Sequence, residues 1–291
     1  MRLGDAPESG NFEDRTGQSG GGMSLGGMGG GIFGLIFQLV ASRFGIIGIL
    51  IMGLGYCALT SLGGSGGILG GGGGSSPTTQ GASRLDPATG KLLKGVLGST
   101  EQVWGQAFQQ AGAKYKPTTL VAYTGGSQSG CGAAQAAMGP FYCPTDQKIY
   151  IDPAFFDELT RRFGAPGDFA QAYVIAHEVG HHVQDLEGTL ARGQSAQASA
   201  GRAGGNQIQV GIELQADCYA GVWAKRSGLL EAGDIEEGMR AAEAIGDDTL
   251  QRQSQGVVVP ESFTHGSSAQ RMEALRRGLQ GGDPAQCNYA R

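Results

Sequence analysis

The segment AHEVGHH, residues 176–182, contains the motif H-E-x-x-H in a chain with only four histidines. His177 and His181 are four residues apart, so on a helix their imidazoles lie on one face and converge on one zinc ion. Glu178 is expected to act as general base on a zinc-activated water without binding the metal. Apolar residues around the motif predict a buried helix over residues 168–187. The alternative is a pair of histidines that only pack inside a helical core.

A catalytic zinc site needs a third protein ligand and one open position. Residues 181–188 read HHVQDLEG, so no further histidine follows at the spacing H-x-x-G-x-x-H. The segment ELQAD, residues 213–217, places Glu213 and Asp217 four residues apart on a second predicted helix. Glu213 is the candidate third ligand, and Asp217 is the candidate acceptor for the second N–H of a ligating histidine. The same spacing also fits the solvated face of an amphipathic helix.

The fourth histidine, His265, lies in the segment FTHGSSAQ, residues 263–270, which predicts a loop that enters a helix. Such a histidine either donates a hydrogen bond to the oxyanion formed during hydrolysis or sits on a surface loop. Ser267 and Gln270 form a candidate capping box for the helix. His182 is one residue off the ligand face, so we expect it beside the site or exposed.

The remaining patterns predict an α+β fold that is mainly helical and has a small sheet. The segment TTLVAY (118–123) predicts a strand, and FYCPTDQKIYID (141–152) predicts a hairpin. The helical patterns cover residues 100–110, 168–187, 206–226, 234–244 and 268–279.

The N-terminal third has a different composition, because 26 of the 55 glycines precede Ala82 without the three-residue period of collagen. Residues 44–62 carry no charge and as a helix would be about 28 Å long, close to the thickness of a bilayer core. A buried soluble helix and a cleaved signal peptide are the alternatives. The predicted organisation is a tail and Gly-rich segment (1–31), a membrane segment (32–62), a linker (63–83) and a domain (84–291). Whether residues 32–43 extend the membrane helix stays open.

Charge suggests how such a segment would be oriented. Arg2, Arg15 and Arg43 precede it and Arg84 is the first basic residue after it, so the positive-inside rule predicts a cytoplasmic N-terminus and an exported domain. The chain carries 21 Lys and Arg against 26 Asp and Glu, a net charge of −5. No basic field is available for nucleic acid, and we therefore exclude nucleic-acid binding.

Four cysteines lie in the predicted domain and Cys57 lies in the predicted membrane segment. An even number in an exported domain indicates two disulfides. Cys131 and Cys143 flank one loop and the start of the hairpin, so we pair them, and Cys218 then pairs with Cys287. Free buried thiols are the alternative, whereas a cysteine metal site is disfavoured because the sequence has no C-x-x-C.

The chain resembles the bacterial "putative neutral zinc metallopeptidase" family over essentially its whole length. The matching segments are residues 11–15, 130–132, 139–144, 149–152, 176–184, 213–221 and 264–266. H-E-x-x-H followed by E-x-x-x-D is also similar to the gluzincin metallopeptidases. The resemblance implies that Glu213 is the third ligand, that Asp217 orients a ligating histidine, and that His265 stabilises the transition state.

These observations lead us to expect a single-pass protein of the bacterial inner membrane. Its zincin-like domain outside the cytoplasm would bind one Zn²⁺ and hydrolyse peptide bonds in a peptide or protein substrate. Two alternatives remain: a zinc-stabilised scaffold without enzymatic activity, and an amidase for a non-peptide or cell-wall amide.

Overall fold

The computed structural model describes residues 1–18 and 82–289. The strands are β1 (Phe12–Asp14), β2 (Thr119–Ala122), β3 (Gly126–Ser129), β4 (Gly132–Gln135), β5 (Phe141–Cys143) and β6 (Lys148–Ile151). The helices are α2 (Pro87–Gln110), α3 (Ala154–Arg161), α4 (Asp168–Leu186), α5 (Thr189–Ser199), α6 (Arg202–Ser227), α7 (Asp234–Ala244), α8 (Asp247–Gln255) and α9 (Ser268–Gly281). Short 3₁₀ turns are η1 (Leu3–Asp5), η2 (Ala136–Met138), η3 (Pro260–Ser262) and η4 (Pro284–Gln286).

The larger sheet has four strands in the order β1-β2-β6-β5. β1, β2 and β6 run parallel, and β5 is antiparallel to β6, with Phe141 opposite Tyr150. The central strands β2 and β6 are buried along most of their length, consistent with their Val, Ile and Leu content. The separate β3–β4 ribbon is antiparallel.

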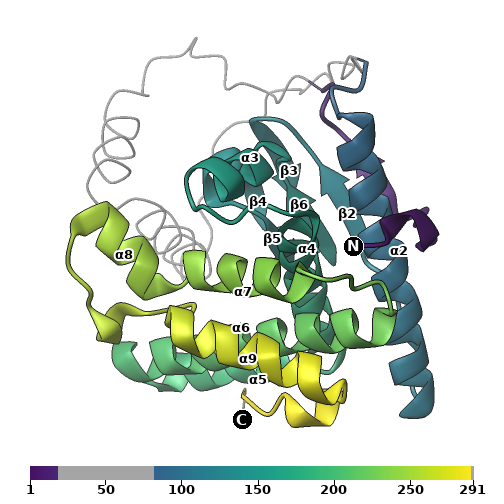
Figure 1. Cartoon of the computed structure of the whole chain (residues 1–291). Coiled ribbons are helices and arrows are strands. Elements are labelled where there is room, and N and C mark those ends of the chain that lie inside the picture. Colours follow the sequence, from purple (N-terminus) through teal and green to yellow (C-terminus); the bar gives the residue numbers. More distant parts are fainter. Residues whose placement is uncertain (19–81, 290–291) are drawn as a thin grey trace, which may run out of the picture.

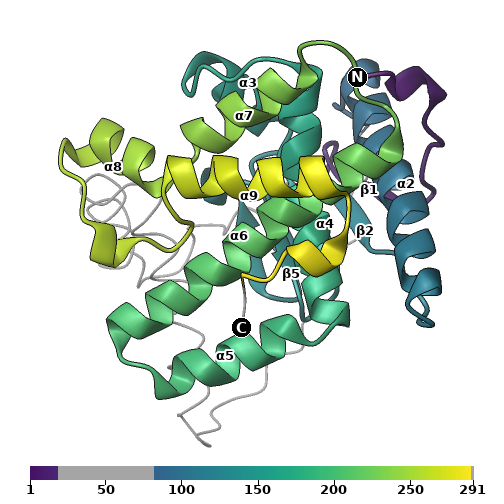
Figure 2. The same ribbon diagram turned by 60° about the horizontal axis from the view of Figure 1, so that its bottom comes forward.

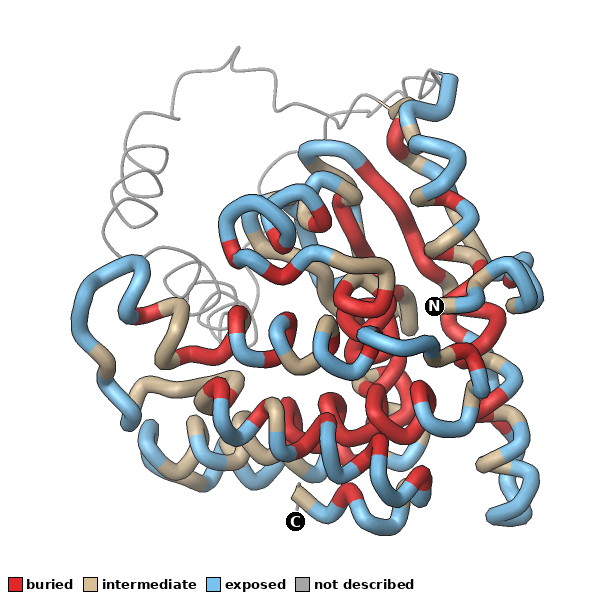
Figure 3. The backbone as a smooth tube through the Cα atoms, viewed as in Figure 1, coloured by how far each residue is buried: buried red, intermediate tan, exposed pale blue. Residues whose placement is uncertain are grey.

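Helix α4 is the central element of the fold. It packs against β5 and β6 of the sheet, and also against α2, α6 and α7 (Figures 1 and 2). Apolar residues such as Tyr173, Ile175 and Val179 are buried around its whole circumference. Helix α4 is buried on nearly every side and lies in the interior, and buried positions concentrate on α4, α6 and the sheet (Figure 3).

Three glycines allow α4, α6 and α9 to approach closely. A Cβ added at Gly180 of α4 would lie 3.0 Å from the Cα and the carbonyl oxygen of Ala216 on α6. A Cβ at Gly221 of α6 would lie 2.3 Å from the carbonyl oxygen of Leu275, and one at Gly278 of α9 would lie 2.0 Å from that of Cys218. Larger residues would force the three helices apart.

Most predicted elements are present. The hairpin forms β5 and β6, the strand is β2, and the helices predicted over 168–187, 206–226, 234–244 and 268–279 are α4, α6, α7 and α9. The capping box of Ser267 and Gln270 is formed. The helix predicted over 100–110 is longer, because Asp86 caps it and Pro87 occupies its first position. The α+β prediction is confirmed, whereas α3, α5, α8, β1 and the β3–β4 ribbon were not predicted.

Residues 1–18 differ from the prediction of a separate cytoplasmic tail, because they pack on the domain. β1 pairs with β2 in parallel register, and the amide of Arg15 donates to the carbonyl of Ala122 at 2.7 Å. The side chain of Asp14 bonds to that of Ser83, and the amide of Arg84 donates to Thr16 Oγ1 at 3.0 Å. Residues 1–18 and the domain therefore share one sheet.

The predicted membrane segment, residues 32–62, and most of the linker lie outside the described residues. Within residues 1–18 and 82–289, no helix is both long and apolar enough to cross a bilayer.

Both predicted disulfides are present. Cys131 is bonded to Cys143 and ties the β3–β4 ribbon to β5, and Cys218 is bonded to Cys287 and ties α6 to the C-terminal segment. Such bonds persist in oxidising compartments.

The packing of β1 predicts that exposed positions in the two described parts react alike in intact cells. Glu8→Cys and Arg161→Cys lie at exposed sites and are each tested in a chain with Cys57→Ser. A membrane-impermeant maleimide should label the two cysteines equally in intact cells, and equally again after lysis. The reason is that the strands of one sheet lie in one compartment. Labelling of only one of them in intact cells would contradict this packing and restore the single-crossing topology.

Candidate metal centre

Helix α4 presents His177 and His181 on one face, as the four-residue spacing predicts. The centres of the two rings are 4.7 Å apart, and both side chains are largely buried. Gly180 lies between them in the sequence and allows α6 to lie close to this part of α4. The glycine inside the motif therefore brings a second helix within reach of the two imidazoles.

Helix α6 contributes Glu213 to the same point. Its Oε2 lies 3.2 Å from Nε2 of His177 and 3.6 Å from Nε2 of His181. One ligand atom from each of these three residues lies within 4.8 Å of the others. Tetrahedral zinc with ligands at about 2.0–2.2 Å needs separations of about 3.3–3.6 Å between ligand atoms. Two imidazoles and one carboxylate in this arrangement fit zinc, although their role as ligands stays a prediction.

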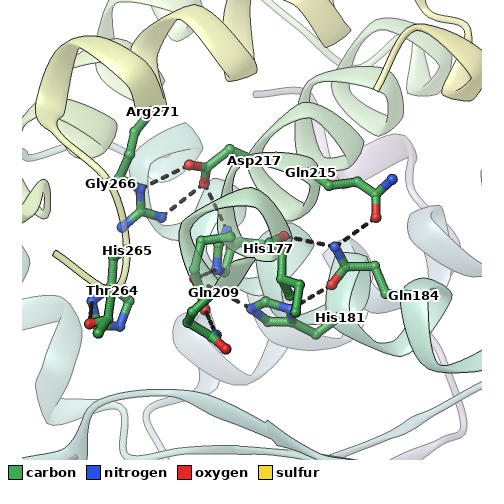
Figure 4. Close-up of polar contacts among 12 residues, drawn as sticks. His177, His181, Gln184, Gln209, Gln215, Asp217, Thr264, His265, Gly266 and Arg271 are labelled. Carbon is green, nitrogen blue, oxygen red and sulfur yellow. Dashed lines mark hydrogen bonds and ion pairs between the residues drawn. The ribbon is translucent and has the colours of Figure 1, made fainter. Parts of the chain in front are cut away.

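Each histidine is held through its other nitrogen. Nδ1 of His177 lies 2.8 Å from Oδ1 of Asp217, and Nδ1 of His181 lies 2.8 Å from Oε1 of Gln184 (Figure 4). An oxygen acceptor at Nδ1 places the proton there and leaves the Nε2 lone pair free. Asp217 thus contacts a ligand candidate as predicted, whereas Gln184 was not predicted.

A buried arginine holds Asp217 in place. Arg271 of α9 donates two hydrogen bonds of 2.9 Å to the Asp217 carboxylate (Figure 4). Tyr173 donates to the same group at 2.6 Å. Burial by itself would raise the pKa of Asp217, but the charge of Arg271 and the hydrogen bonds from Arg271 and His177 outweigh burial and lower it to about 2. Asp217 is therefore ionised at all ordinary pH values. Arg271 was missed because nothing local in the sequence QRMEALRR distinguishes it from its exposed neighbours.

His265 lies in the loop between η3 and α9. Its Nδ1 is 3.1 Å from Oδ1 of Asp247, and Oδ2 of Asp247 accepts the backbone N–H groups of Thr264, His265 and Gly266. Burial alone would lower the pKa of His265, but Asp247 and the negative charge of Glu213 outweigh it and raise the pKa. The carboxylate of Asp247 thus holds the backbone of this loop and also orients the ring of His265. Asp247 was not predicted, since its role depends on contacts with a loop that lies 18 positions further along the sequence.

Glu178 and His182 flank the ligand candidates on α4. Glu178 is buried beside His177, with 7% of its surface exposed. His182 is fully buried, and its Nε2 donates to the carbonyl of Lys116 at 2.6 Å, while its Nδ1 lies 3.0 Å from the hydroxyl of Tyr142 on β5. His182 therefore joins α4 to the sheet, and the alternative that it is exposed is wrong.

A second group of acidic side chains lies within ligand distance of one another, but its contacts indicate a structural role. It consists of Asp168, Asp234 and Glu237, near the start of α4. The amino group of Met1 donates to Asp168 and Asp234, and Glu237 accepts the N–H of Phe169. These carboxylates are thus already engaged by donors of the chain itself.

Comparison with known proteins identifies the family to which the chain is similar. The family described as "Putative neutral zinc metallopeptidase" matches residues 1–290. The chain is 46% identical to "Uncharacterized protein YpfJ" of Escherichia coli (strain K12) over 298 residues, 99% of this chain and 98% of that protein. It is 46% identical to "Uncharacterized protein Rv2575" of Mycobacterium tuberculosis (strain ATCC 25618 / H37Rv) over 180 residues, 57% of this chain and 60% of that protein. No solved structure matches the chain.

The contact between Arg271 and Asp217 predicts a large loss of stability for Arg271→Met. Removing one partner of a buried charge pair leaves the other unpaired, which costs about 3–5 kcal/mol of unfolding free energy. Arg276→Met on the same helix is the matched control. Arg276 is exposed and pairs with exposed Glu273, so its loss should change the free energy by less than about 0.5 kcal/mol. Equal urea midpoints for the two variants would refute the role given to Arg271.

Proposed function

The chain belongs to this family of zinc metallopeptidases, and we propose that it hydrolyses peptide bonds at the centre built by α4 and α6. The observation that carries the proposal is the convergence of His177, His181 and Glu213 on one point, at separations that fit a single zinc ion. The proposal assigns the chain one Zn²⁺. The partly exposed His265 beside this point suits a site that substrate reaches, which a closed structural zinc site does not need.

The metal would be held by Nε2 of each histidine and by the Glu213 carboxylate. When bound there, Zn²⁺ supplies a Lewis acid that lowers the pKa of a water molecule and polarises the scissile carbonyl. Asp217 and Gln184 keep the proton of each ligating imidazole on Nδ1, so that Nε2 is available as a ligand. The chain's own contribution at this stage is orientation.

Glu178 and His265 would handle the proton and the developing charge. The carboxylate of Glu178 accepts a proton from the attacking water and delivers it to the nitrogen of the leaving amine. His265, fixed by Asp247 through Nδ1, donates from Nε2 to the oxyanion that forms on the substrate carbonyl. Burial of Glu178 keeps this transfer away from bulk solvent.

An extended peptide is the substrate class that the sheet favours. β5 ends the strand order of the described sheet and lies next to α4, joined to it by the hydrogen bond of Tyr142 to Asp185 at 2.8 Å. A peptide added as a further strand at this edge would be held by main-chain hydrogen bonds beside the proposed metal centre. This mode of binding distinguishes a peptidase from an amidase for a non-peptide amide.

We further propose that the enzyme works outside the cytoplasm, at the inner membrane. Two disulfides favour an oxidising compartment, and the uncharged residues 44–62 favour contact with a bilayer. Because β1 and β2 belong to one sheet, we infer that residues 1–18 and 82–289 lie in one compartment, and we revise the topology. The membrane segment would attach the protein without carrying its N-terminus to the opposite side.

Two substitutions separate the general base from the ligand. Glu178→Gln keeps the shape of the side chain and should retain about one zinc per chain, while peptidase activity falls by about 10²–10⁴-fold. Glu213→Ala should lose zinc and, as a consequence, activity. Metal content by plasma mass spectrometry and cleavage of a peptide library test both. A Glu178→Gln variant with the parent's rate, or a Glu213→Ala variant with the parent's zinc affinity, would refute the assignment.

His265→Ala should keep zinc and slow turnover by about 10²–10³-fold, the usual cost of an oxyanion donor. The matched control is His182→Gln, because His182 is buried but bonded away from the ligand candidates. Zinc content and kcat are measured for both variants. A larger fall in kcat for His182→Gln than for His265→Ala would argue against an oxyanion role for His265.

A further inference from the structure

A chain of hydrogen bonds runs from His181 to the C-terminal segment through two glutamines. Nδ1 of His181 lies 2.8 Å from Oε1 of Gln184, and Nε2 of Gln184 donates to Oε1 of Gln215 at 2.9 Å and to the carbonyl of Ile212 at 2.7 Å. Nε2 of Gln215 then donates to the carbonyl of Cys287 at 2.8 Å. Both glutamines are buried, and the first three members of the chain are visible in Figure 4.

Backbone carbonyls at the end of this chain of hydrogen bonds determine which group donates and which accepts in each bond. Backbone carbonyls only accept, so the NH₂ of Gln215 must face Cys287 and its oxygen must face Gln184. The NH₂ of Gln184 must then face Gln215 and Ile212, which turns its oxygen toward His181. An oxygen at that position requires the proton of His181 on Nδ1 and leaves Nε2 as the ligand atom. The Ile212 and Cys287 carbonyls together therefore fix the tautomer of His181.

The far end of this chain is held covalently. Cys287 is almost fully buried and is bonded to Cys218 of α6, one turn after Gln215. The carbonyl that Gln215 needs thus belongs to a residue that the disulfide fastens to the same helix. The close approach of Gly278 to Cys218 places α9, which leads into this segment, against α6.

We propose that Gln184 and Gln215 are positioning residues for His181, and that the Cys218–Cys287 disulfide anchors them. The inference rests on the proposed role of His181 as a zinc ligand. It gives this disulfide a function beyond stability: closure of the C-terminal segment orients one metal ligand. The Cys131–Cys143 disulfide fastens the β3–β4 ribbon and has no part in this chain of bonds.

The test is zinc affinity of the full-length protein, measured by competition with a chromophoric chelator. Gln184→Met keeps the volume and removes the acceptor of His181, so affinity should fall by about 10–100-fold, as for other residues that orient metal ligands. Gln215→Met should lower it by about tenfold, and so should Cys218→Ser combined with Cys287→Ser. The Co²⁺-loaded forms should also change their visible absorption, because the field of the ligands changes.

Two controls separate orientation from stability. Cys131→Ser combined with Cys143→Ser removes the other disulfide, and Gln251→Met removes another buried glutamine, which bonds to Ser262 and Val259. Both variants should lower the melting temperature and leave zinc affinity within about twofold of the parent, since none of the substituted residues contacts the chain of hydrogen bonds from His181 to Cys287. The double variant Gln184→Met with Gln215→Met should bind zinc no more weakly than Gln184→Met alone, because both act through one acceptor.

The outcomes are distinct. Parental zinc affinity in Gln184→Met would overturn the proposal, and so would parental affinity in both Gln215→Met and the Cys218–Cys287 variant. Additive losses of zinc affinity in the double variant would overturn the claim that both glutamines act through one hydrogen-bond acceptor of His181. A parent protein that binds no zinc at all would instead refute the proposed function on which the inference rests.

Discussion

The approach of α4 to α6 is the constraint on which the rest of the structure depends. At Gly180 the two helices are so close that a Cβ would lie 3.0 Å from the backbone of Ala216. This contact sets Glu213 opposite His177 and His181, and sets Asp217 opposite the far side of His177. The matching glycines Gly221 and Gly278 bring α9 onto α6. Arg271 thereby reaches Asp217, and the Cys218–Cys287 disulfide holds the carbonyl that accepts from Gln215.

Electrostatics explains why these residues depend on one another. Asp217 and Glu213 are both buried carboxylates, which the interior tolerates only with partners. Arg271 balances Asp217, and a divalent cation beside Glu213 would balance the second charge. Asp217 can then serve as a permanent acceptor for His177 while the net charge of the cluster stays small. Arg271 therefore acts on the metal centre through a carboxylate, without contacting a ligand itself.

The sequence predicted the parts of the site that are local. H-E-x-x-H and E-x-x-x-D each place two side chains on one helical face, so their spacing alone is informative. Arg271, Asp247, Gln184 and Gln215 were not predicted, because their roles arise from contacts between helices that no periodicity reveals. β1 was missed for the same reason, as a three-residue strand pairs with β2 more than 100 residues away. The order of segments around residues 19–81 suggested two compartments, whereas one sheet contains strands from both sides of that segment.

The central claim is that one zinc ion is held between α4 and α6. A crystal of the zinc-loaded full-length protein, with anomalous differences collected on both sides of the zinc absorption edge, tests it most directly. The account predicts one strong peak within about 2.2 Å of Nε2 of His177, Nε2 of His181 and a carboxylate oxygen of Glu213. No peak at that point, or a zinc ion held instead by Asp168, Asp234 and Glu237, would contradict it.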